Sequence, residues 1–326
     1  MKSALITGIN GQDGSYLAEL LLKKGYEVHG TLKRNSIPEN QTARLQHIYP
    51  QIKNNLHHAD MCDMSSLLSV VQASQPDEIY NLAAQSHVRV SFDQPIYTLD
   101  TIARGTLNLL EVVRLTGIYS KLYQASSSEM FGNSIDDDGF QRETTPMNPV
   151  SPYACAKLCA YNLMRCYRES YDMFTTNGIL FNHESPRRGG SFVTNKIVMG
   201  AVKIKTGHAT SLALGNLDST RDWGHAKDYV KVMWQLLQLS KPGDYVCATG
   251  MSHSVREFCE STFSKLGMDY RDYVTKDVRF LRPTELNDLK GSTEKLASVI
   301  DLNFEYTFDT MIDEMIEYWM EKYSQW

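Results

Sequence analysis

The sequence predicts an α/β protein with a doubly wound parallel sheet and a second, smaller lobe. Two observations support this fold class. Short apolar runs alternate with amphipathic stretches through the first half of the chain, and a glycine-rich turn joins the first run to the first stretch. With 326 residues the chain is long enough for two interleaved lobes. We expect residues 1–180 to form the sheet domain and 181–326 to form mainly the second lobe, with elements near 225–250 returning to the first.

The strands expected in the first lobe are short apolar segments. They are Ser3–Thr7, Glu27–Leu32, Leu56–His58, Glu78–Leu82, Lys121–Ala125 and Thr175–Phe181. The helices expected between them carry apolar residues at helical spacing, as the first does at Tyr16, Leu17, Leu20 and Leu21. They are Asp13–Lys24, Met64–Ala73, Thr98–Thr116 and Ser151–Ser170.

Beyond Phe181 the pattern loosens and turn signals such as Gly189-Gly190 and Gly215-Asn216 become frequent. This predicts a smaller lobe over the carboxyl edge of the sheet. The helices expected beyond Phe181 are Phe192–Lys205, His225–Leu239, Val255–Leu266 and Phe308–Tyr323. Of the elements in this half, Ala226–Leu239 and the strand Asp244–Ala248 are the ones expected to return to the first lobe.

Composition excludes several classes of function. The net charge of −5 and the pI of about 6.0 give no basic surface for nucleic acid. The N-terminus opens into a short strand without a signal-peptide core, and no apolar run is long enough to cross a membrane. We therefore expect a soluble, cytoplasmic protein. The six cysteines form no C-x-x-C pair, and no histidine accompanies Cys155 and Cys159, which predicts small buried thiols and no metal site.

The turn Thr7–Gly14 has the pattern G-x-x-G-x-x-G between a strand and a helix. This is the context of a dinucleotide-binding Rossmann fold, because glycine lets the backbone approach a pyrophosphate at a helix N-terminus. The alternative is an ordinary glycine-rich turn. The expected cofactor contacts here are Gly8, Asn10, Gly11, Gln12, Asp13 and Gly14.

The end of the second strand indicates which nicotinamide cofactor is bound. An acid usually holds the ribose 2′-hydroxyl of NAD, but Lys33 and Arg34 stand here instead. Arg34 would pair with a 2′-phosphate, so the sequence favours NADP, the alternative being a solvated basic turn. Further contacts are expected after the next two strands, at Asp60, Met61, Leu82, Ala83, Ala84 and Ser86.

Tyr153 and Lys157 lie one helical turn apart, and Ser127 and Glu129 precede them at a strand end. A cation beside a phenol favours the phenolate, so we expect Lys157 to lower the pKa of Tyr153 and make it a general base for an alcohol. Glu129 would then abstract a proton next to the ketone that forms. The alternative for Glu129 is a local cap or salt bridge.

At this point the chain resembles the GDP-mannose 4,6-dehydratase family, of the extended short-chain dehydrogenase/reductase group, over nearly its whole length. The resemblance rests on Thr7–Tyr16 (TGINGQDGSY), Asp77–Val88 (DEIYNLAAQSHV), Tyr123–Glu129 (YQASSSE), Ser151–Lys157 (SPYACAK), Asn177–Gly189 (NGILFNHESPRRG), Arg221–Tyr229 (RDWGHAKDY) and Arg282–Glu285 (RPTE).

The resemblance implies an NADP-dependent lyase that turns GDP-mannose into GDP-4-keto-6-deoxy-mannose, a first step toward GDP-fucose or GDP-rhamnose. It implies that Ser127, Glu129, Tyr153 and Lys157 are catalytic and that the enzyme is a homodimer or homotetramer. It adds cofactor contacts at Tyr97, Lys157, His183 and Arg188, and substrate contacts at Ser86, Asn182, Lys196, Arg221, Arg282 and Glu285.

Two other readings of the same fold stay open. One is a nucleotide-sugar epimerase or 4-ketoreductase, or a dehydratase with a side NADPH-dependent reductase activity. The other is an NADP-binding regulatory module without catalysis. The sequence also departs from the family at Ser127, where a threonine is usual. Losing that methyl group frees the rotamer of the hydroxyl.

Overall fold

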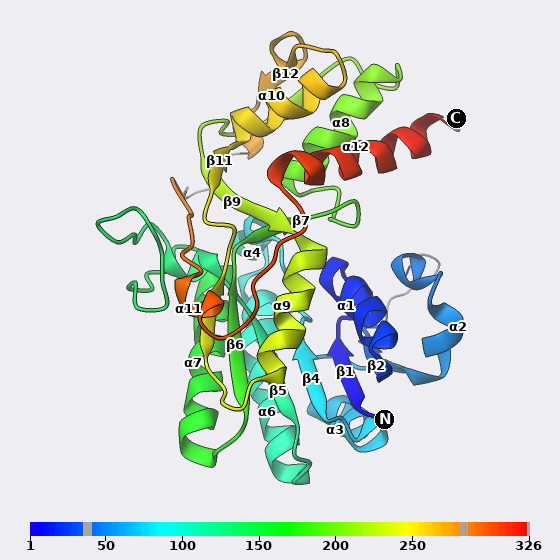
Figure 1. Ribbon diagram of the computed structural model, residues 1–326, viewed down its shortest axis with the longest axis vertical. Helices are drawn as coiled ribbons and strands as arrows, with labels where there is room; N and C mark the ends of the chain where they lie inside the picture. The colour runs from blue at the N-terminus through cyan, green and yellow to red at the C-terminus, as the bar shows by residue number, and fades with distance from the viewer. Residues whose placement is uncertain (35–40, 281–283, 285, 325–326) are drawn as a thin grey trace.

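The computed structural model describes residues 1–34, 41–280, 284 and 286–324. The chain folds into two lobes (Figure 1). The sheet lobe consists of a parallel sheet with helices on both faces, and the smaller lobe lies above the carboxyl edge of that sheet. The C-terminal helix α12 (Phe308–Ser324) lies in the smaller lobe, far from the N-terminus at the lower end of β1 (Ser3–Thr7).

The sheet has seven strands in the order β10-β6-β5-β4-β1-β2-β3, and every neighbouring pair is parallel. The order reverses between β1 and β4, which is the place where doubly wound sheets bind ligands at their carboxyl ends. The predicted fold class is thus confirmed. The strands are β1 (Ser3–Thr7), β2 (Glu27–Leu32), β3 (Leu56–His58), β4 (Glu78–Asn81), β5 (Lys121–Ser127), β6 (Thr175–Leu180) and β10 (Asp244–Cys247).

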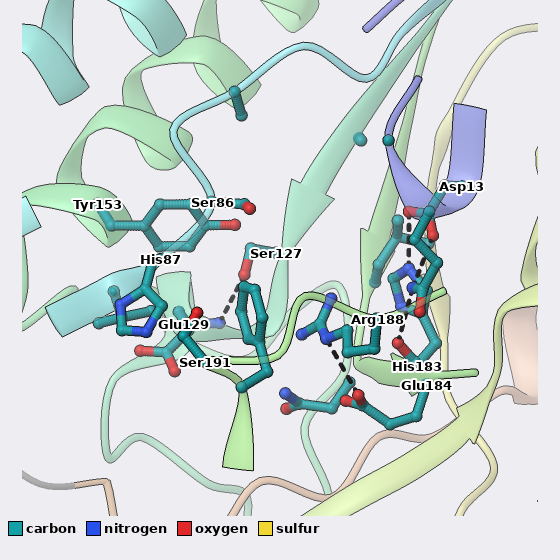
Figure 2. Close-up of a pocket in the computed structure, with 18 of the residues that line it drawn as sticks. Asp13, Ser86, His87, Ser127, Glu129, Tyr153, His183, Glu184, Arg188 and Ser191 are labelled. Atoms are coloured by element: carbon teal, nitrogen blue, oxygen red, sulfur yellow. Dashed lines mark hydrogen bonds and ion pairs between the residues drawn. The ribbon is translucent and has the colours of Figure 1, made fainter. Parts of the chain in front are cut away.

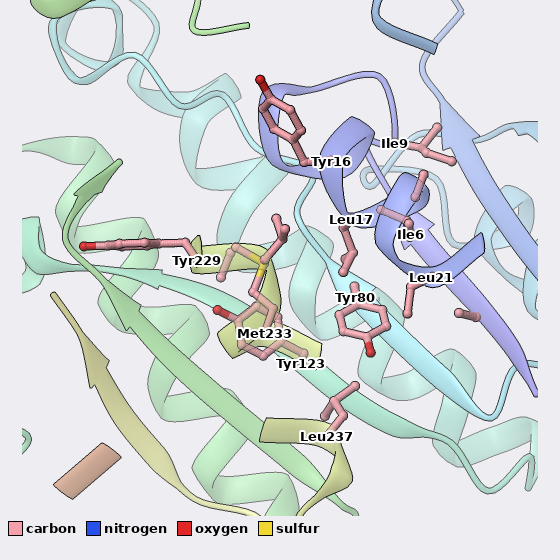
Figure 3. Close-up of a cluster of buried hydrophobic side chains, with 14 of the residues drawn as sticks. Ile6, Ile9, Tyr16, Leu17, Leu21, Tyr80, Tyr123, Tyr229, Met233 and Leu237 are labelled. Atoms are coloured by element: carbon pink, nitrogen blue, oxygen red, sulfur yellow. The ribbon is translucent and has the colours of Figure 1, made fainter. Parts of the chain in front are cut away.

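Helices cover both faces because side chains alternate across each strand. In β5, Leu122 packs into the core under the helices of one face, and its neighbour Tyr123 packs into the core of the other. Figure 3 shows the second core, where Leu17 and Leu21 lie near Tyr80. The helices on that face are α1 (Gln12–Lys23) and α9 (Ala226–Gln238), and those on the opposite face are α3 (Met64–Ser74), α6 (Gly105–Thr116) and α7 (Pro152–Tyr171).

The start of α7 is well defined by its sequence. The Ser151 hydroxyl accepts a hydrogen bond from the amide of Ala154 at 3.1 Å, and Pro152 occupies the first helical turn. Tyr153 and Lys157 therefore lie at the end of α7 that faces the carboxyl edge of the sheet.

The helix predicted over residues 98–116 is longer and less regular in the structure. It begins with α5 (Pro95–Leu99), passes through a π-helical stretch (Asp100–Arg104) and continues as α6. Such stretches of wider helix often occur near functional sites, and Thr101 of this one lines the cavity described below.

The smaller lobe has its own apolar core, formed by α8, α10, α12 and two short sheets. Its strands are β7 (Asn182–Glu184), β8 (Leu212–Leu214), β9 (Thr220–His225), β11 (Ser252–Ser254) and β12 (Val274–Lys276). Its helices are α8 (Val193–Lys205), α10 (Val255–Lys265) and α12 (Phe308–Ser324). Three short helices lie elsewhere, α2 (Tyr49–Ile52), α4 (Val88–Asp93) and α11 (Glu294–Ala297).

The prediction of buried thiols is wrong for three cysteines. Cys155, Cys159 and Cys166 are exposed on α7, because their spacing puts them on the side of the helix that faces away from the sheet. Cys247 and Cys259 are buried, and all six cysteines are free. Among the residues that the structure describes, no helix is long and apolar enough to cross a membrane. Within the same residues no three His, Cys, Asp or Glu side chains gather as a metal site would require.

Candidate active site

A cavity of about 1190 Å³ opens at the carboxyl edge of the sheet and extends under the smaller lobe. It is lined by the glycine-rich turn after β1, by the segments that follow β2 to β6, and by parts of α7, α8 and β9. Figure 2 shows its two ends: Ser127, Glu129 and Tyr153 lie at one, Asp13 and His183 at the other.

The backbone of the glycine-rich turn is packed so tightly against itself that a side chain at Gly14 would not fit. Gly8 has a φ of +67°, and the amide of Gly11 donates to its carbonyl oxygen at 2.9 Å. A Cβ on Gly14 would come within 2.5 Å of that same oxygen. The backbone of this turn and the N-terminus of α1 therefore lie open to the cavity, which fits a dinucleotide pyrophosphate.

At the β5–α7 end, the Ser127 hydroxyl accepts a hydrogen bond from the amide of Glu129 at 3.3 Å. This bond caps a short 3₁₀ turn (Ser128–Phe131) and fixes the backbone that carries Glu129. Lys157 Nζ donates to the carbonyl oxygen of Ala125 at 2.6 Å and lies 5.7 Å from the centre of the Tyr153 ring. Four residues separated by up to 30 positions in the chain thus meet at one end of the cavity.

Burial dominates the ionisation of this end. It raises the pKa of Tyr153 to about 12, although a hydrogen bond from Ser127 works in the opposite direction. It also lowers the pKa of Lys157 to about 8, against the weaker attraction of Asp13. The predicted lowering of the Tyr153 pKa is therefore wrong for the protein without ligands, because both groups lose hydration on burial and this disfavours their charged forms.

At the opposite end, His183 and Asp13 form an ion pair. His183 Nε2 is 2.8 Å from Asp13 Oδ2, and its Nδ1 donates to the carbonyl oxygen of Phe181, also at 2.8 Å. Burial alone would lower the pKa of His183 and raise that of Asp13, but their mutual attraction and hydrogen bond outweigh it. The pKa of His183 is raised and that of Asp13 is lowered.

Two further contacts tie the glycine-rich turn to the segment after β7. Ser185 Oγ donates to Gln12 Oε1 at 2.8 Å, and Gln12 Nε2 donates to the carbonyl oxygen of His183 at 3.1 Å. Nearby, Arg188 forms an ion pair with the buried Glu184 at 3.0 Å and packs its guanidinium over the Phe192 ring. These contacts fix Arg188 at the cavity wall.

The end of β2 differs from the expectation. Lys33 lines the cavity, with its Nζ 3.0 Å from Asp60 Oδ2 and 3.0 Å from the hydroxyl of Tyr97. Arg34, the residue predicted to select the cofactor, is exposed and does not line the cavity. Both residues follow the end of β2 at Leu32, and the contacts with Asp60 and Tyr97 hold Lys33 at the cavity wall.

Most of the predicted site residues line the cavity together. They are Gly8, Asn10, Gly11, Gln12, Asp13, Gly14, Asp60, Met61, Leu82, Ala83, Ala84, Ser86, Tyr97, Ser127, Glu129, Tyr153, Lys157, Asn182, His183, Arg188, Lys196 and Arg221. Arg282 and Glu285 lie outside the residues that the structure describes.

Several lining residues were not predicted. Besides Lys33, the polar or aromatic ones include Thr31, His87, Thr101, Ser128, Glu184, Ser191, Phe192, Thr194, Asn216 and Trp223. His87 and Glu184 lie inside the segments that carry the family resemblance, so position within those segments was a usable signal. Ser128 and Trp223 also lie inside such segments, whereas Thr31, Thr101, Ser191, Phe192, Thr194 and Asn216 lie outside them.

The fold and the site define an α/β enzyme class with a dinucleotide-type turn at one end of a cavity and a buried Tyr–Lys pair at the other. The family model described as GDP-mannose 4,6 dehydratase matches residues 5–315. The chain belongs to the GDP-mannose 4,6-dehydratase family.

Relatives from distant organisms match almost end to end. GDP-mannose 4,6 dehydratase 2 of Arabidopsis thaliana is 51% identical over 330 residues, which cover 97% of this chain and 87% of the relative. The GDP-mannose 4,6 dehydratase of Homo sapiens is 47% identical, covering 96% of this chain and 90% of the relative.

Solved structures share the fold at lower identity. DesIV, a dTDP-glucose 4,6-dehydratase from Streptomyces venezuelae solved with NAD and TYD bound, has a TM-score of 0.85 at 22% identity, covering 99% of this chain and 98% of that one. RMD from Pseudomonas aeruginosa, complexed with NADPH, has a TM-score of 0.82 at 22% identity, covering 99% and 100%.

Proposed function

We propose that this protein is a GDP-mannose 4,6-dehydratase that converts GDP-mannose into GDP-4-keto-6-deoxy-mannose. The observation that carries the proposal is the meeting of Ser127, Glu129, Tyr153 and Lys157 at one end of the cavity. A phenol and a lysine suffice to oxidise an alcohol with a bound nicotinamide. A carboxylate beside them is needed only if a carbon-bound proton is also removed.

NADP is the cofactor we propose. It supplies a nicotinamide that accepts the hydride from C4 of the sugar and returns it at C6. The glycine-rich turn would hold its pyrophosphate, and Lys33 would pair with its 2′-phosphate in place of the predicted Arg34. RMD is described with NADPH and DesIV with NAD, so both cofactor types occur on this fold and the charge at the end of β2 decides.

The residues of this chain would divide the proton transfers between them. Tyr153, as the phenolate, takes the proton of the C4 hydroxyl, while Ser127 donates a hydrogen bond to the same oxygen. Lys157, whose ammonium donates to the carbonyl oxygen of Ala125, places a positive charge near this phenolate and so favours its formation before the proton transfer. Glu129 removes the C5 proton, which the ketone at C4 makes acidic, and passes a proton to the C6 oxygen that leaves as water.

The nucleotide end of the substrate would lie against the smaller lobe. Lys196 and Arg221 line the cavity there, and cations of this kind bind a diphosphate. Lys196 Nζ lies 3.2 Å from the centre of the Phe280 ring, and burial lowers its pKa. A diphosphate at this position would stabilise its charged form. Asn182 and Ser86 would complete the contacts.

The experiment that tests the function is NMR analysis of the product formed from GDP-mannose in deuterated water. We expect a 4-keto-6-deoxy sugar with deuterium at C5, formed without consumption of added NADPH. A C4 epimer without deuterium at C5 would indicate an epimerase. Stoichiometric use of NADPH would indicate a reductase, and recovery of unchanged GDP-mannose would leave a binding module without catalysis.

We also propose that the enzyme is a homodimer or homotetramer in the cytoplasm. Ile96, Leu99 and Leu107 are exposed on the adjacent helices α5 and α6, which is the kind of apolar surface that a second copy covers. The six free cysteines suit a reducing compartment. Analytical ultracentrifugation tests the first statement, because a monomer at all concentrations would contradict it, and cell fractionation tests the second.

A further inference from the structure

His87 lines the cavity, and neither the sequence analysis nor the proposed reaction gives it a role. It follows Ser86 in the loop after β4 and immediately precedes α4. Its ring is half-buried, 5.2 Å from the ring of Phe192. Figure 2 shows it on the same side of the cavity as Glu129 and Tyr153, away from the Asp13–His183 pair.

The contacts of His87 define where its proton lies. Its Nδ1 accepts a hydrogen bond from the amide of Val90, at 3.4 Å, as the cap of α4. A nitrogen that accepts carries no proton, so the proton of the neutral ring is on Nε2. The backbone on both sides is held by Gln85, whose Oε1 accepts from the His87 amide at 2.7 Å and whose Nε2 donates to the His87 carbonyl at 3.1 Å. These contacts fix the loop and place the ring N–H on Nε2.

The proposed reaction needs such a donor. Glu129 is the one carboxylate proposed for both proton transfers at C5 and C6, and hydroxide is a poor leaving group unless its oxygen is held as charge develops on it. Ser127 is assigned to the C4 oxygen, and Lys157 donates to Ala125. Neither is therefore placed to hold the C6 oxygen.

We propose that His87 holds the C6 hydroxyl of the sugar through its Nε2–H while Glu129 carries out the proton transfer. This inference rests on the proposed function. The C5–H bond breaks with its proton passing to Glu129, the C5–C6 double bond forms, and the C6–O bond breaks. The proton on Glu129 then joins the leaving oxygen to give water. His87 keeps its own proton throughout, because a neutral imidazole that lost it would become an anion.

Two substitutions separate this role from the capping of α4. In His87→Asn, the side-chain oxygen stands near the place of Nδ1 and keeps the cap, but the donor at the place of Nε2 is lost. In His87→Gln, an N–H donor returns near the place of Nε2 while the cap is lost. We expect kcat to fall about 100-fold in His87→Asn and to recover to within about 10-fold of wild type in His87→Gln. Thermal unfolding of each purified variant reports on folding.

The second measurement is the deuterium content of GDP-mannose recovered from partial reactions in deuterated water. If His87 assists only the loss of water, C5 deprotonation in His87→Asn continues and reverses, so recovered substrate gains deuterium at C5 well above the wild-type level. A loosened pocket would slow both steps and leave recovered substrate unlabelled. Wild-type kcat in His87→Asn, or slow turnover without this labelling, would overturn the proposal. Failure of the wild-type enzyme to form the keto-sugar would instead overturn the proposed function.

Discussion

The two ends of the cavity bury ionisable groups to a similar extent, but the pKa shifts favour neutral forms at one end and charged forms at the other. Tyr153 at one end and His183 at the other are each 8% exposed. Burial pushes Tyr153 and Lys157 toward their neutral forms, whereas the attraction between His183 and Asp13 outweighs burial and shifts the pKa of each toward its charged form. An opposite charge nearby stabilises the charged form of a buried group, and burial without such a partner destabilises it.

This difference matches what each end is proposed to do. At the glycine-turn end, which is proposed to bind the cofactor, the paired His183 and Asp13 favour each other's charged form. The β5–α7 end moves protons, so its groups must be able to lose or gain charge during the reaction. Substitutions at both ends of the cavity test this contrast, and they are ordered below by the size of the effect.

Tyr153→Phe removes the proposed base and keeps the ring. We expect kcat with GDP-mannose to fall by about 10³-fold, the scale of a lost general base. Tyr161→Phe is the matched control, because Tyr161 is on the same helix and burial also raises its pKa to about 12, yet it lies outside the cavity. Equal losses in the two variants would show that packing of α7, and not the hydroxyl of Tyr153, limits turnover.

Lys157→Met should abolish turnover while stabilising the protein without ligands. The pKa of Lys157 is about 8 when folded and near 10.5 when unfolded, so the folded ammonium is unfavourable below pH 8 and this penalty fades as the pH rises toward 10.5. Allowing for the lost hydrogen bond to Ala125, we expect a gain of about 2 kcal/mol at pH 7. Urea unfolding at pH 7 and pH 10 measures it, and a variant less stable than wild type at pH 7 contradicts it.

Asp13→Asn should shift the titration of His183. Its pKa lies above 6.5 in the wild type because of Asp13, and without that charge burial should move it below 6.5. Because the pKa of His183 is raised on folding, protonated His183 stabilises the fold fully below pH 6.5, its unfolded pKa. This stabilisation is lost as the pH rises through the higher pKa of the folded state. The lowered pKa of Asp13 contributes above about pH 3.8 and is lost below its folded value. NMR titration of the histidine ring signals measures the shift, and an unchanged pKa would show that the pair does not hold the charge.

Lys33→Met should weaken NADP binding by about 10-fold, as expected for one lost charge-assisted contact. Arg34→Met is the control, since Arg34 does not line the cavity and should change the Kd by less than about 2-fold. NAD binding should respond to neither substitution. Calorimetric titration with NADP and with NAD measures these Kd values. A larger effect of Arg34→Met than of Lys33→Met would show that Arg34 binds the 2′-phosphate, as predicted from the sequence.

Ser127→Thr should have the smallest effect, a change in kcat of within about 3-fold. The hydroxyl stays, and the added methyl group restricts its rotamer. Ser127→Ala is the comparison and should lose about 100-fold, because it removes a hydrogen bond to the reacting oxygen. Steady-state kinetics measures both, and similar losses would mean that the site rejects the methyl group.

Much of the fold could be predicted because its signals are local. The strands of the large sheet begin where the apolar runs begin and end within two residues of the predicted positions, and the glycine-rich turn stands where its pattern does. Tyr153 and Lys157 were also predictable, because one helical turn joins them. The π-helical stretch before α6 was not, since it arises from packing.

The missed features depend on which way a side chain faces in the folded chain. Lys33 and Arg34 are alike in sequence, but only Lys33 lines the cavity. Cys155 is of a residue type that is usually buried, but it lies on the outer side of α7. The direction of the pKa shift of Tyr153 depends on its burial, which the spacing to Lys157 does not contain.

The central claim is that one hydrogen of the sugar moves from C4 to C6 within a single cavity while Glu129 exchanges a proton at C5. The most direct test uses GDP-mannose deuterated at C4 in ordinary water, with the product analysed by NMR. We expect the deuterium to appear at C6 of the 4-keto-6-deoxy product, with ordinary hydrogen from solvent at C5. Deuterium that remained at C4, or that was lost to solvent or to free NADPH, would contradict it.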